Sequence, residues 1–253
     1  MSVAAHPAVA HLRRGYRTVL LIGLLFYAWL LVLVTAGFWR PGNKTTRRAK
    51  RHWCRCALIV LGVRVSRNGT ATPSPALWVS NHISWLDILV LSAEQPLVFL
   101  SKREVGNWPI VGTLARAVGT QFIDRGAGQT AQVNDQISLC LREGISVIIF
   151  PEGTTTDGTT CRRFYPQLFH APLLSLSPVQ PVTLRYGSAA GEPDTRVAFI
   201  DDMALQTHLW ERLAVARTPV SLTYAPAIST SPELSRLELC QKSHSAVSMA
   251  LQV

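Results

Sequence analysis

The fold is decided by the stretch Asn81-His82-Ile83-Ser84-Trp85-Leu86-Asp87, which follows an apolar run at 76–79 that predicts a buried strand. A histidine takes up a proton near neutral pH, and a neighbouring carboxylate stabilises the charged ring. Five residues apart on one helix, the two side chains would point about 140° apart. We therefore expect His82 on a loop and Asp87 in the first turn of the following helix, with Ser84 as its N-cap. The alternative is a structural histidine beside a helix-capping serine.

Beyond this stretch, apolar runs of strand length alternate with segments of helical periodicity. The clearest strand is the β-branched run at 146–150, and the clearest helix spans 129–143 and ends at Gly144. We also expect strands at 63–67, 97–100, 121–123, 179–186, 196–200 and 220–224, and helices at 88–91, 108–115 and 203–216. This alternation predicts an α/β fold with a mixed sheet flanked by helices.

Positive charge is concentrated in the N-terminal third. The chain has 253 residues, enough for one substantial core, and a formal net charge of +10. Residues 1–86 hold twelve Lys or Arg and no acidic residue, whereas the remainder holds thirteen basic and all fifteen acidic residues. Because the basic residues adjoin the most hydrophobic segment, we expect an anionic lipid surface as the partner and no nucleic acid.

An uncharged segment runs from Thr18 to Trp39 and is almost entirely apolar at 19–34. Its length suffices for a membrane span, and its apolar run is longer than that of a typical secretory signal peptide, the main alternative. Arginines flank both ends, so the positive charge does not orient a span. The same flanks suit a helix or hairpin held in one leaflet. We expect an N-terminal membrane-associated helical segment in either case.

The next segment is strongly basic from Thr45 to Arg55 and apolar at 57–61. This pattern favours an amphipathic helix at the membrane interface, with Trp53 near the lipid headgroups. The alternative is a soluble basic helix packed on the domain. We expect the chain to divide into a membrane anchor with a basic interfacial helix at 1–62 and a second domain at 63–253.

The five cysteines are scattered and odd in number: Cys54, Cys56, Cys140, Cys161 and Cys240. Cys54 and Cys56 lack the partner spacing of a zinc site, and no disulfide framework is implied. We therefore expect a reduced domain that faces the cytosol. Neither a metal cluster nor a nucleotide-binding motif is apparent in the sequence, so no cofactor is implied.

Three further motifs adjoin predicted strand ends, where open α/β sheets bind ligands. The block at 119–125 places Arg125 just past a strand, where it could hold a phosphate or form a salt bridge with Asp124. The block Phe150-Pro151-Glu152-Gly153-Thr154-Thr155-Thr156 offers close backbone approach at its glycine and several donors for an anion, or is a polar turn. The apolar block at 179–182 contains a proline that suits a sheet edge or a bend.

In order and spacing, these four motifs resemble those of the glycerolipid and lysophospholipid acyltransferase family, namely NHxxxxD, a GxxFIDR-like block, FPEGT and a VxPV-like block. The resemblance covers roughly residues 76–186, and the first and third motifs are complete. It implies transfer of a fatty acyl group from acyl-CoA or acyl carrier protein to a lysolipid hydroxyl. It also implies that His82 is the general base, that Asp87 is its partner, and that the acceptor is bound by Arg125, Glu152, Gly153 and Thr154.

One departure from the family pattern leaves the acceptor open. Many phosphatidate-forming members follow FPEGT with Arg-Ser, whereas this chain has Thr155-Thr156-Asp157-Gly158, which resembles members that acylate other lysolipids. Arg162 and Arg163 could restore the charge. We expect 1-acylglycerol-3-phosphate as the acceptor, giving phosphatidic acid, with a lyso-ornithine lipid or another lysolipid as the alternative.

Two other functions compete with acyl transfer. A hydrolase is disfavoured because no GxSxG motif occurs in the sequence. A non-catalytic lipid-binding membrane protein would keep the anchor but would not need the histidine–aspartate pair beside FPEGT. We expect a membrane enzyme whose catalytic domain faces the cytoplasm, at the inner membrane of a bacterium.

Overall fold

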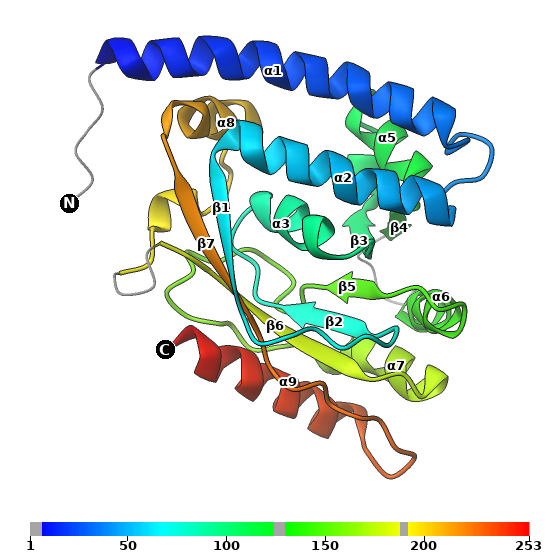
Figure 1. Ribbon diagram of the computed structural model, residues 1–253. Coiled ribbons are helices and arrows are strands. Elements are labelled where there is room, and N and C mark those ends of the chain that lie inside the picture. The colour runs from blue at the N-terminus through cyan, green and yellow to red at the C-terminus, as the bar shows by residue number, and fades with distance from the viewer. Residues whose placement is uncertain (1–6, 124–129, 188–191, 253) are drawn as a thin grey trace.

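The computed structural model describes residues 7–123, 130–187 and 192–252. Its strands are β1 (Val63–Asn68), β2 (Leu77–Ser80), β3 (Val98–Lys102), β4 (Gln121–Ile123), β5 (Val147–Ile149), β6 (Val179–Tyr186) and β7 (Thr218–Tyr224). Within the described residues they form one seven-stranded sheet in the order β1-β7-β6-β2-β5-β3-β4. Neighbouring strands are parallel except β6 and β7, which are antiparallel. The expected mixed sheet is therefore confirmed (Figure 1).

Helices cover both faces of this sheet (Figure 1). On one side lie α1 (Pro7–Val34), α2 (Lys44–Leu61), α3 (Leu86–Glu94) and α8 (Leu205–Ala214). On the other side lie α6 (Thr130–Arg142), α7 (His170–Ser175) and α9 (Arg236–Leu251). The remaining helices are α4 (Arg103–Gly106), α5 (Val111–Ala117) and the 3₁₀ turns η1 (Pro166–Phe169) and η2 (Thr195–Val197).

The alternation of side chains along the central strands supplies both layers of the core. Trp78 of β2 and Ile148 of β5 pack with α2 and α3, whereas Leu77 and Val79 pack with α6, α7 and α9. Strands covered on both faces carry continuous apolar runs, as the sequence of β2 and β5 does. Burying each such side chain contributes about 1.5–3 kcal/mol, so the sheet holds the strand ends firmly in place.

One sequence expectation about strands is wrong, and one of the two alternatives for Pro181 is excluded. Residues 196–200 contain part of η2 and no strand, because β6 and β7 pair directly with each other and this segment crosses to the loop after β2, where Phe199 N donates to Ile83 O at 2.9 Å. Pro181 lies in an interior strand and not at an edge. The sheet tolerates it because the pairing of β6 with β7 begins one residue later, at Val182.

Helix α2 packs its apolar side against the domain. Cys54, Ala57, Leu58 and Leu61 are buried, and the helix lies between α1 and α3 (Figure 1). Trp53, which we expected near lipid headgroups, is instead partly buried and donates its indole N–H to Leu24 O of α1 at 2.7 Å. This packing matches the alternative of a basic helix packed on the domain.

The basic residues of α2 find partners at the C-terminal end of α3. Arg51 Nε and Arg55 Nε both donate to Ala93 O, at 3.2 and 3.0 Å. Carbonyls at a helix C-terminus carry partial negative charge, so cations there are stabilising. The charge asymmetry of the sequence thus serves in part to attach α2 to the domain.

Helix α1 lies along α2 and α8 (Figure 1). Arg17 is buried and donates to Leu213 O, Val215 O and Ala216 O at 3.2, 2.6 and 3.1 Å. Among the described residues, α1 is the helix that is long and apolar enough to cross a membrane, yet only 11% of its most apolar window is buried. The helix therefore has one face held by the protein and a long apolar face that is exposed.

Candidate active site

His82 lies on the loop between β2 and α3, and Asp87 lies in the first turn of α3. His82 Nδ1 is 2.8 Å from Asp87 Oδ2. The structure therefore brings the pair together at a loop-to-helix junction, as the spacing predicts. The aspartate side chain is completely buried, whereas the histidine side chain is 20% exposed. The His82 ring thus contacts the carboxylate through Nδ1, and another part of the ring is open to small molecules.

Asp87 is the most heavily bonded side chain of the site. Its Oδ2 also accepts from Ile83 N at 2.7 Å and from Ser84 N at 2.9 Å, and its Oδ1 accepts from Tyr186 Oη at 2.7 Å. Because Oδ2 already accepts from two backbone N–H groups, the His82 ring donates to it from Nδ1. The other ring nitrogen, Nε2, is then unprotonated and can accept a proton.

The predicted N-cap is wrong. Trp85 is the N-cap of α3, and Ser84 Oγ is buried without a hydrogen-bond partner in the described structure. The reason is that the carboxylate of Asp87 reaches back and accepts from the free N–H groups before the helix. The aspartate therefore holds the loop before the helix and orients the histidine with the same oxygen.

Tyr186 is a residue of the site that the sequence does not reveal. It lies at the end of β6, and burial, followed by the nearby Asp87 carboxylate, raises the pKa of its phenol well above the usual value. The hydroxyl therefore stays protonated and serves as a donor to Asp87. Nothing in the local sequence separates it from an ordinary core tyrosine, because its partner is 99 residues away.

Asn81 fixes the start of the histidine loop. Its Nδ2 donates to Leu184 O at 2.9 Å, and its Oδ1 accepts from Leu184 N at 2.8 Å. The first residue of the motif is thus bonded to the backbone of β6 in both directions. The imidazole of His82 also stacks on Phe150, with ring centroids 3.9 Å apart and planes 10° apart. The position and plane of the ring are both constrained.

Glu152 joins the histidine loop to the segment that follows the FPEGT turn. Its Oε1 accepts from His82 N at 2.8 Å, and its Oε2 accepts from Arg162 N at 2.7 Å. Burial raises the pKa of this carboxyl, and the two backbone N–H groups oppose that effect. Thr156 N donates in turn to His82 O at 2.8 Å. Both backbone groups of the histidine are therefore bonded to the third motif.

Two glycines let the turn adopt this path. Gly153 has φ +73° and Gly158 has φ +82°, a conformation that other residues rarely adopt. A Cβ at Gly158 would lie 2.9 Å from Ile83 Cδ1, next to the histidine. The segment Thr155-Thr156-Asp157-Gly158, which departs from the family pattern, therefore packs over the histidine loop.

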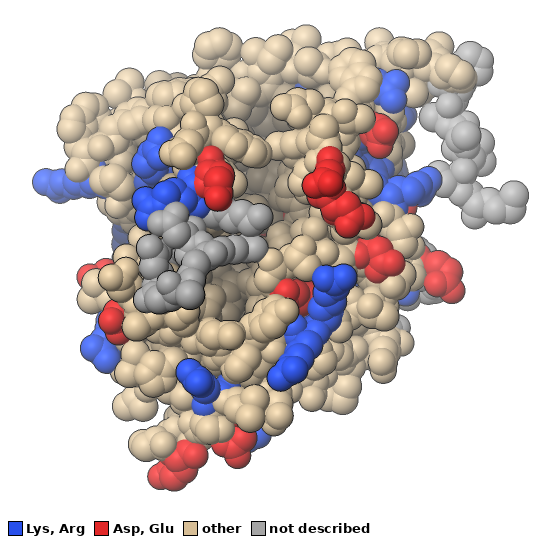
Figure 2. Space-filling view, turned by 180° about the vertical axis from the view of Figure 1, so that it is seen from behind, with Lys and Arg blue, Asp and Glu red and all other residues tan. Residues whose placement is uncertain are grey.

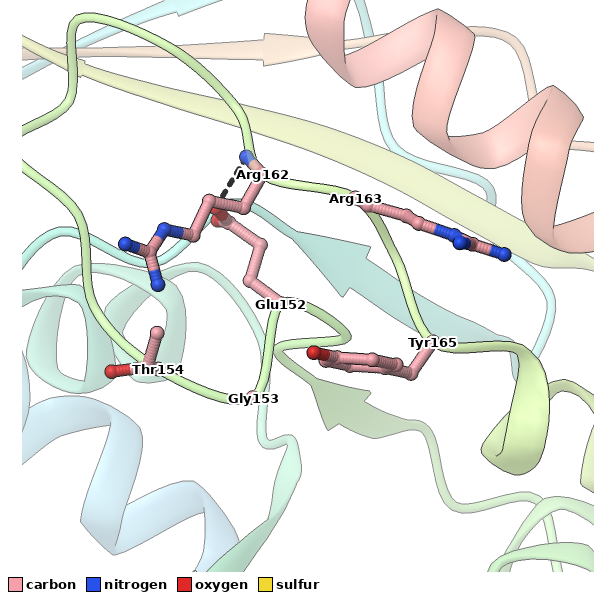
Figure 3. A pocket seen from close by; sticks show the side chains of 6 residues that line it. All are labelled: Glu152, Gly153, Thr154, Arg162, Arg163 and Tyr165. Carbon is pink, nitrogen blue, oxygen red and sulfur yellow. Dashed lines mark hydrogen bonds between the residues drawn. The ribbon is translucent and has the colours of Figure 1, made fainter.

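Two of the other predicted residues lie beside this centre, at a cavity next to the FPEGT turn. Gly153 and Thr154 line a cavity of about 350 Å³ together with Glu152, Arg162, Arg163 and Tyr165 (Figure 3). The face of the molecule away from the viewer in Figure 1 is hollowed and carries basic and acidic side chains around the hollow (Figure 2). Arg125 lies outside the described residues. The block at 179–182 forms the first half of β6 and is buried.

Within the described ranges, no group of three or more His, Cys, Asp or Glu side chains could hold a metal ion. The five cysteines are free thiols.

Comparisons with known proteins agree with the motif pattern. A family model described as Acyltransferase matches residues 62–185. The chain is 39% identical to a lyso-ornithine lipid O-acyltransferase of Pseudomonas aeruginosa over 96% of its own length and 95% of the relative. It is 29% identical to a 1-acyl-sn-glycerol-3-phosphate acyltransferase of Neisseria gonorrhoeae over 74% of its own length and 73% of the relative. The crystal structure of PlsC, a 1-acyl-sn-glycerophosphate acyltransferase of Thermotoga maritima, has the same fold, with TM-score 0.65, 19% identity and coverage of 93% and 96% of the two chains.

Proposed function

This chain belongs to the acyltransferase family, and from this premise we propose that it transfers a fatty acyl group from a thioester to the hydroxyl of a lysolipid. The observation that carries the proposal is the 2.8 Å contact between His82 Nδ1 and Asp87 Oδ2 at the end of β2. An alcohol attacks a thioester slowly until a base removes its proton. With Nδ1 on Asp87, Nε2 of the partly exposed ring is the nitrogen that can take this proton.

The reaction is a direct transfer. His82 Nε2 takes the proton of the acceptor hydroxyl while the hydroxyl oxygen bonds to the thioester carbonyl carbon. The tetrahedral intermediate then expels the thiolate, which receives the proton from the imidazolium. Asp87 keeps the ring in the correct tautomer and stabilises its charged form, and Tyr186 and Asn81 hold Asp87 and the loop in place. The donor is acyl-CoA or acyl carrier protein.

Substrate binding falls to the motif residues around this centre. Arg125, Gly153 and Thr154 would contact the acceptor, the latter two from the cavity beside the turn. Glu152 would act mainly by position, because both of its carboxylate oxygens are occupied by backbone N–H groups.

A lyso-ornithine lipid is the acceptor that the relatives favour, since three proteins named lyso-ornithine lipid O-acyltransferase are 36–39% identical to this chain. Thr155 agrees with this choice, because no second cation follows FPEGT directly. The second candidate is 1-acylglycerol-3-phosphate, supported by the relative from Neisseria gonorrhoeae.

The membrane contact would be made by α1 lying in one leaflet. The helix is tied to the domain from Arg13, which donates to Ala214 O, to Leu24, which accepts from Trp53. Standing across a bilayer would break these bonds. Lying flat would place the exposed apolar side chains, such as Phe26 and Leu30, among the lipid chains. Exposed Arg40, Lys44 and Arg48 would then meet anionic headgroups at the cytoplasmic surface of a bacterial inner membrane.

Vesicle binding tests this placement. Phe26→Glu should weaken binding of the full-length protein to vesicles of anionic lipid, because burying a phenylalanine is worth about 1.5–3 kcal/mol. Leu237→Glu, at an exposed leucine of α9 on the opposite side of the sheet, is the matched control. Equal binding of the two variants would contradict the placement.

Acyl transfer is tested with the purified full-length protein in mixed micelles. Labelled acyl-CoA and acyl-loaded carrier protein are each offered with lyso-ornithine lipid, lysophosphatidate and lysophosphatidylethanolamine. Formation of the diacylated lipid with one equivalent of free thiol supports the proposal. Thiol release with free fatty acid as the product, whatever the acceptor, would identify a hydrolase and overturn it.

A further inference from the structure

The cavity beside the FPEGT turn has two arginines on one short segment. Arg162 and Arg163 line it together with Thr154, Gly153 and Tyr165 (Figure 3). In this view the Arg162 side chain extends toward the side of the cavity where Thr154 lies. The Arg163 side chain extends in the opposite direction, and it also lines a second, smaller hollow beside α9. The two neighbouring arginines are therefore not equivalent.

Glu152 sets the position of Arg162 relative to the catalytic histidine. The same carboxylate accepts from Arg162 N and from His82 N, so one side chain spans the two segments. It is 3% exposed, which makes this link rigid. The backbone of Arg162 is therefore held beside the histidine loop, and its side chain reaches the cavity from there.

The charge of Arg162 is available for a ligand. Within the described part of the chain, neither Arg162 nor Arg163 forms an ion pair with a carboxylate. Glu152 does not neutralise the guanidinium directly, because both of its oxygens are bonded to backbone N–H groups. An exposed arginine without a partner beside a cavity is a natural binding site for a planar anion, since its donors match a carboxylate in pairs.

The charges in the cavity suit an acceptor group with one negative charge. The two arginines and the buried Glu152 leave a net charge of about +1 when Glu152 is ionised, the form that its two N–H donors favour. Thr155 adds no donor here, because its hydroxyl donates to Phe199 O at 2.6 Å. Thr154 is exposed and lines the cavity, so its hydroxyl can supply one more hydrogen bond.

We propose that Arg162, assisted by the Thr154 hydroxyl, binds the carboxylate of an amino-acid headgroup on the lysolipid acceptor. This inference rests on the proposed acyl transfer and names the acceptor group that the cavity recognises. An ornithine headgroup carries such a carboxylate, whereas a phosphate monoester carries a tetrahedral group with up to two negative charges. Arg162 is thus a specificity-determining residue, separate from the histidine–aspartate pair.

The test removes the same interaction from the protein and from the acceptor. Lyso-ornithine lipid and its carboxyl methyl ester are compared with wild-type protein, Arg162→Gln and, as a matched control, Arg163→Gln. Wild-type protein should prefer the free acid over the ester by about 10-fold to 100-fold in kcat/KM, the usual value of a charged hydrogen bond. Arg162→Gln should lose this preference and keep the acyl-donor KM, whereas Arg163→Gln should retain the preference.

Three outcomes would overturn the inference: a wild-type protein that accepts acid and ester equally, an Arg162→Gln variant that still prefers the acid, or an equal loss in Arg163→Gln. The last result would indicate general positive charge and not a defined site. The acid-to-ester ratio also separates binding from folding, because a merely unstable variant loses both reactions alike. If the wild-type protein acylates no lysolipid, the proposed function itself fails. If the protein acylates lysophosphatidate but does not distinguish lyso-ornithine lipid from its methyl ester, only the proposed headgroup site is contradicted.

Discussion

The two sides of Glu152 are built in opposite ways. On the His82 side, Asp87 is completely buried and accepts four hydrogen bonds. On the Arg162 side, the guanidinium and Thr154 are exposed and face an open cavity. The proposed acyl transfer requires one geometry of His82 and Asp87, and buried contacts hold these two residues in it. In the proposed function, headgroup recognition rests on surface side chains, which can be exchanged without disturbing the core.

The largest effect is expected from His82→Ala. Removing a positioned base should lower kcat by about 100-fold to 10,000-fold, with little effect on folding because the side chain is partly exposed. The measurement is acyl transfer at saturating donor and acceptor, together with a thermal melt. His170→Ala, at an exposed histidine of α7, is the control and should keep full activity. A folded His82→Ala protein with near wild-type turnover would disprove the assigned base.

Asp87→Asn should have the next largest effect, and it should act on both rate and stability. The amide can present an N–H group where the carboxylate accepts from Ile83 N and Ser84 N, and it favours the wrong histidine tautomer. We expect kcat to fall by about 100-fold. Each buried donor left unsatisfied should cost about 1–3 kcal/mol. Steady-state kinetics and denaturant unfolding measure the two effects, and an unchanged kcat would show that Asp87 serves only folding.

Tyr186→Phe removes one of the four hydrogen bonds and should lower kcat by about 10-fold, the value of one ordinary hydrogen bond lost from the oriented pair. Tyr224→Phe is a matched control, because Tyr224 Oη donates to Glu94 Oε2 at 3.0 Å on another carboxylate that is not bonded to His82. Both variants should be destabilised in a thermal melt. Only Tyr186→Phe should lose turnover, and equal turnover in the two variants would limit the role of Tyr186 to stability.

Local sequence patterns predicted the parts of the fold that depend on neighbours in the chain. The bounds of the strand Val179–Tyr186 match the sequence expectation, because an apolar run with clear breaks specifies a buried strand. The spacing of His82 and Asp87 also predicted where the two could meet, since helix geometry leaves one such arrangement, and the structure shows that they do.

Contacts between distant segments could not be predicted in the same way. Each of these contacts joins residues about 100 positions apart in the sequence: Tyr186 with Asp87, Asn81 with Leu184, and Phe199 with Ile83. For the same reason no strand forms at 196–200, because Phe199 N donates to Ile83 O of the histidine loop and not to a neighbouring strand. The sequence shows Arg162 as a positive charge, but its place beside Glu152 depends on the fold.

The smallest effect is expected from Thr154→Val, on the exposed side of the comparison. This change removes one neutral hydroxyl from the cavity and should raise the KM for lyso-ornithine lipid by about 3-fold, with kcat unchanged. Thr155→Val is the matched control, because its hydroxyl is bonded to Phe199 O and does not line the cavity. That control should lower the melting temperature by about 2–4 °C for a loss of ~1 kcal/mol and leave the acceptor KM unchanged.

Combining Thr154→Val with Arg162→Gln gives the sharpest form of this prediction. If both side chains bind one carboxylate, the double variant should lose less acceptor affinity than the two single losses added together, because each interaction depends on the position fixed by the other. Combining Thr154→Val with Tyr186→Phe should instead give additive losses, since one acts on binding and the other on the buried pair. Additive losses for Thr154 and Arg162 would place their contacts on separate parts of the acceptor, and coupling between Thr154 and Tyr186 would contradict the division of the site at Glu152.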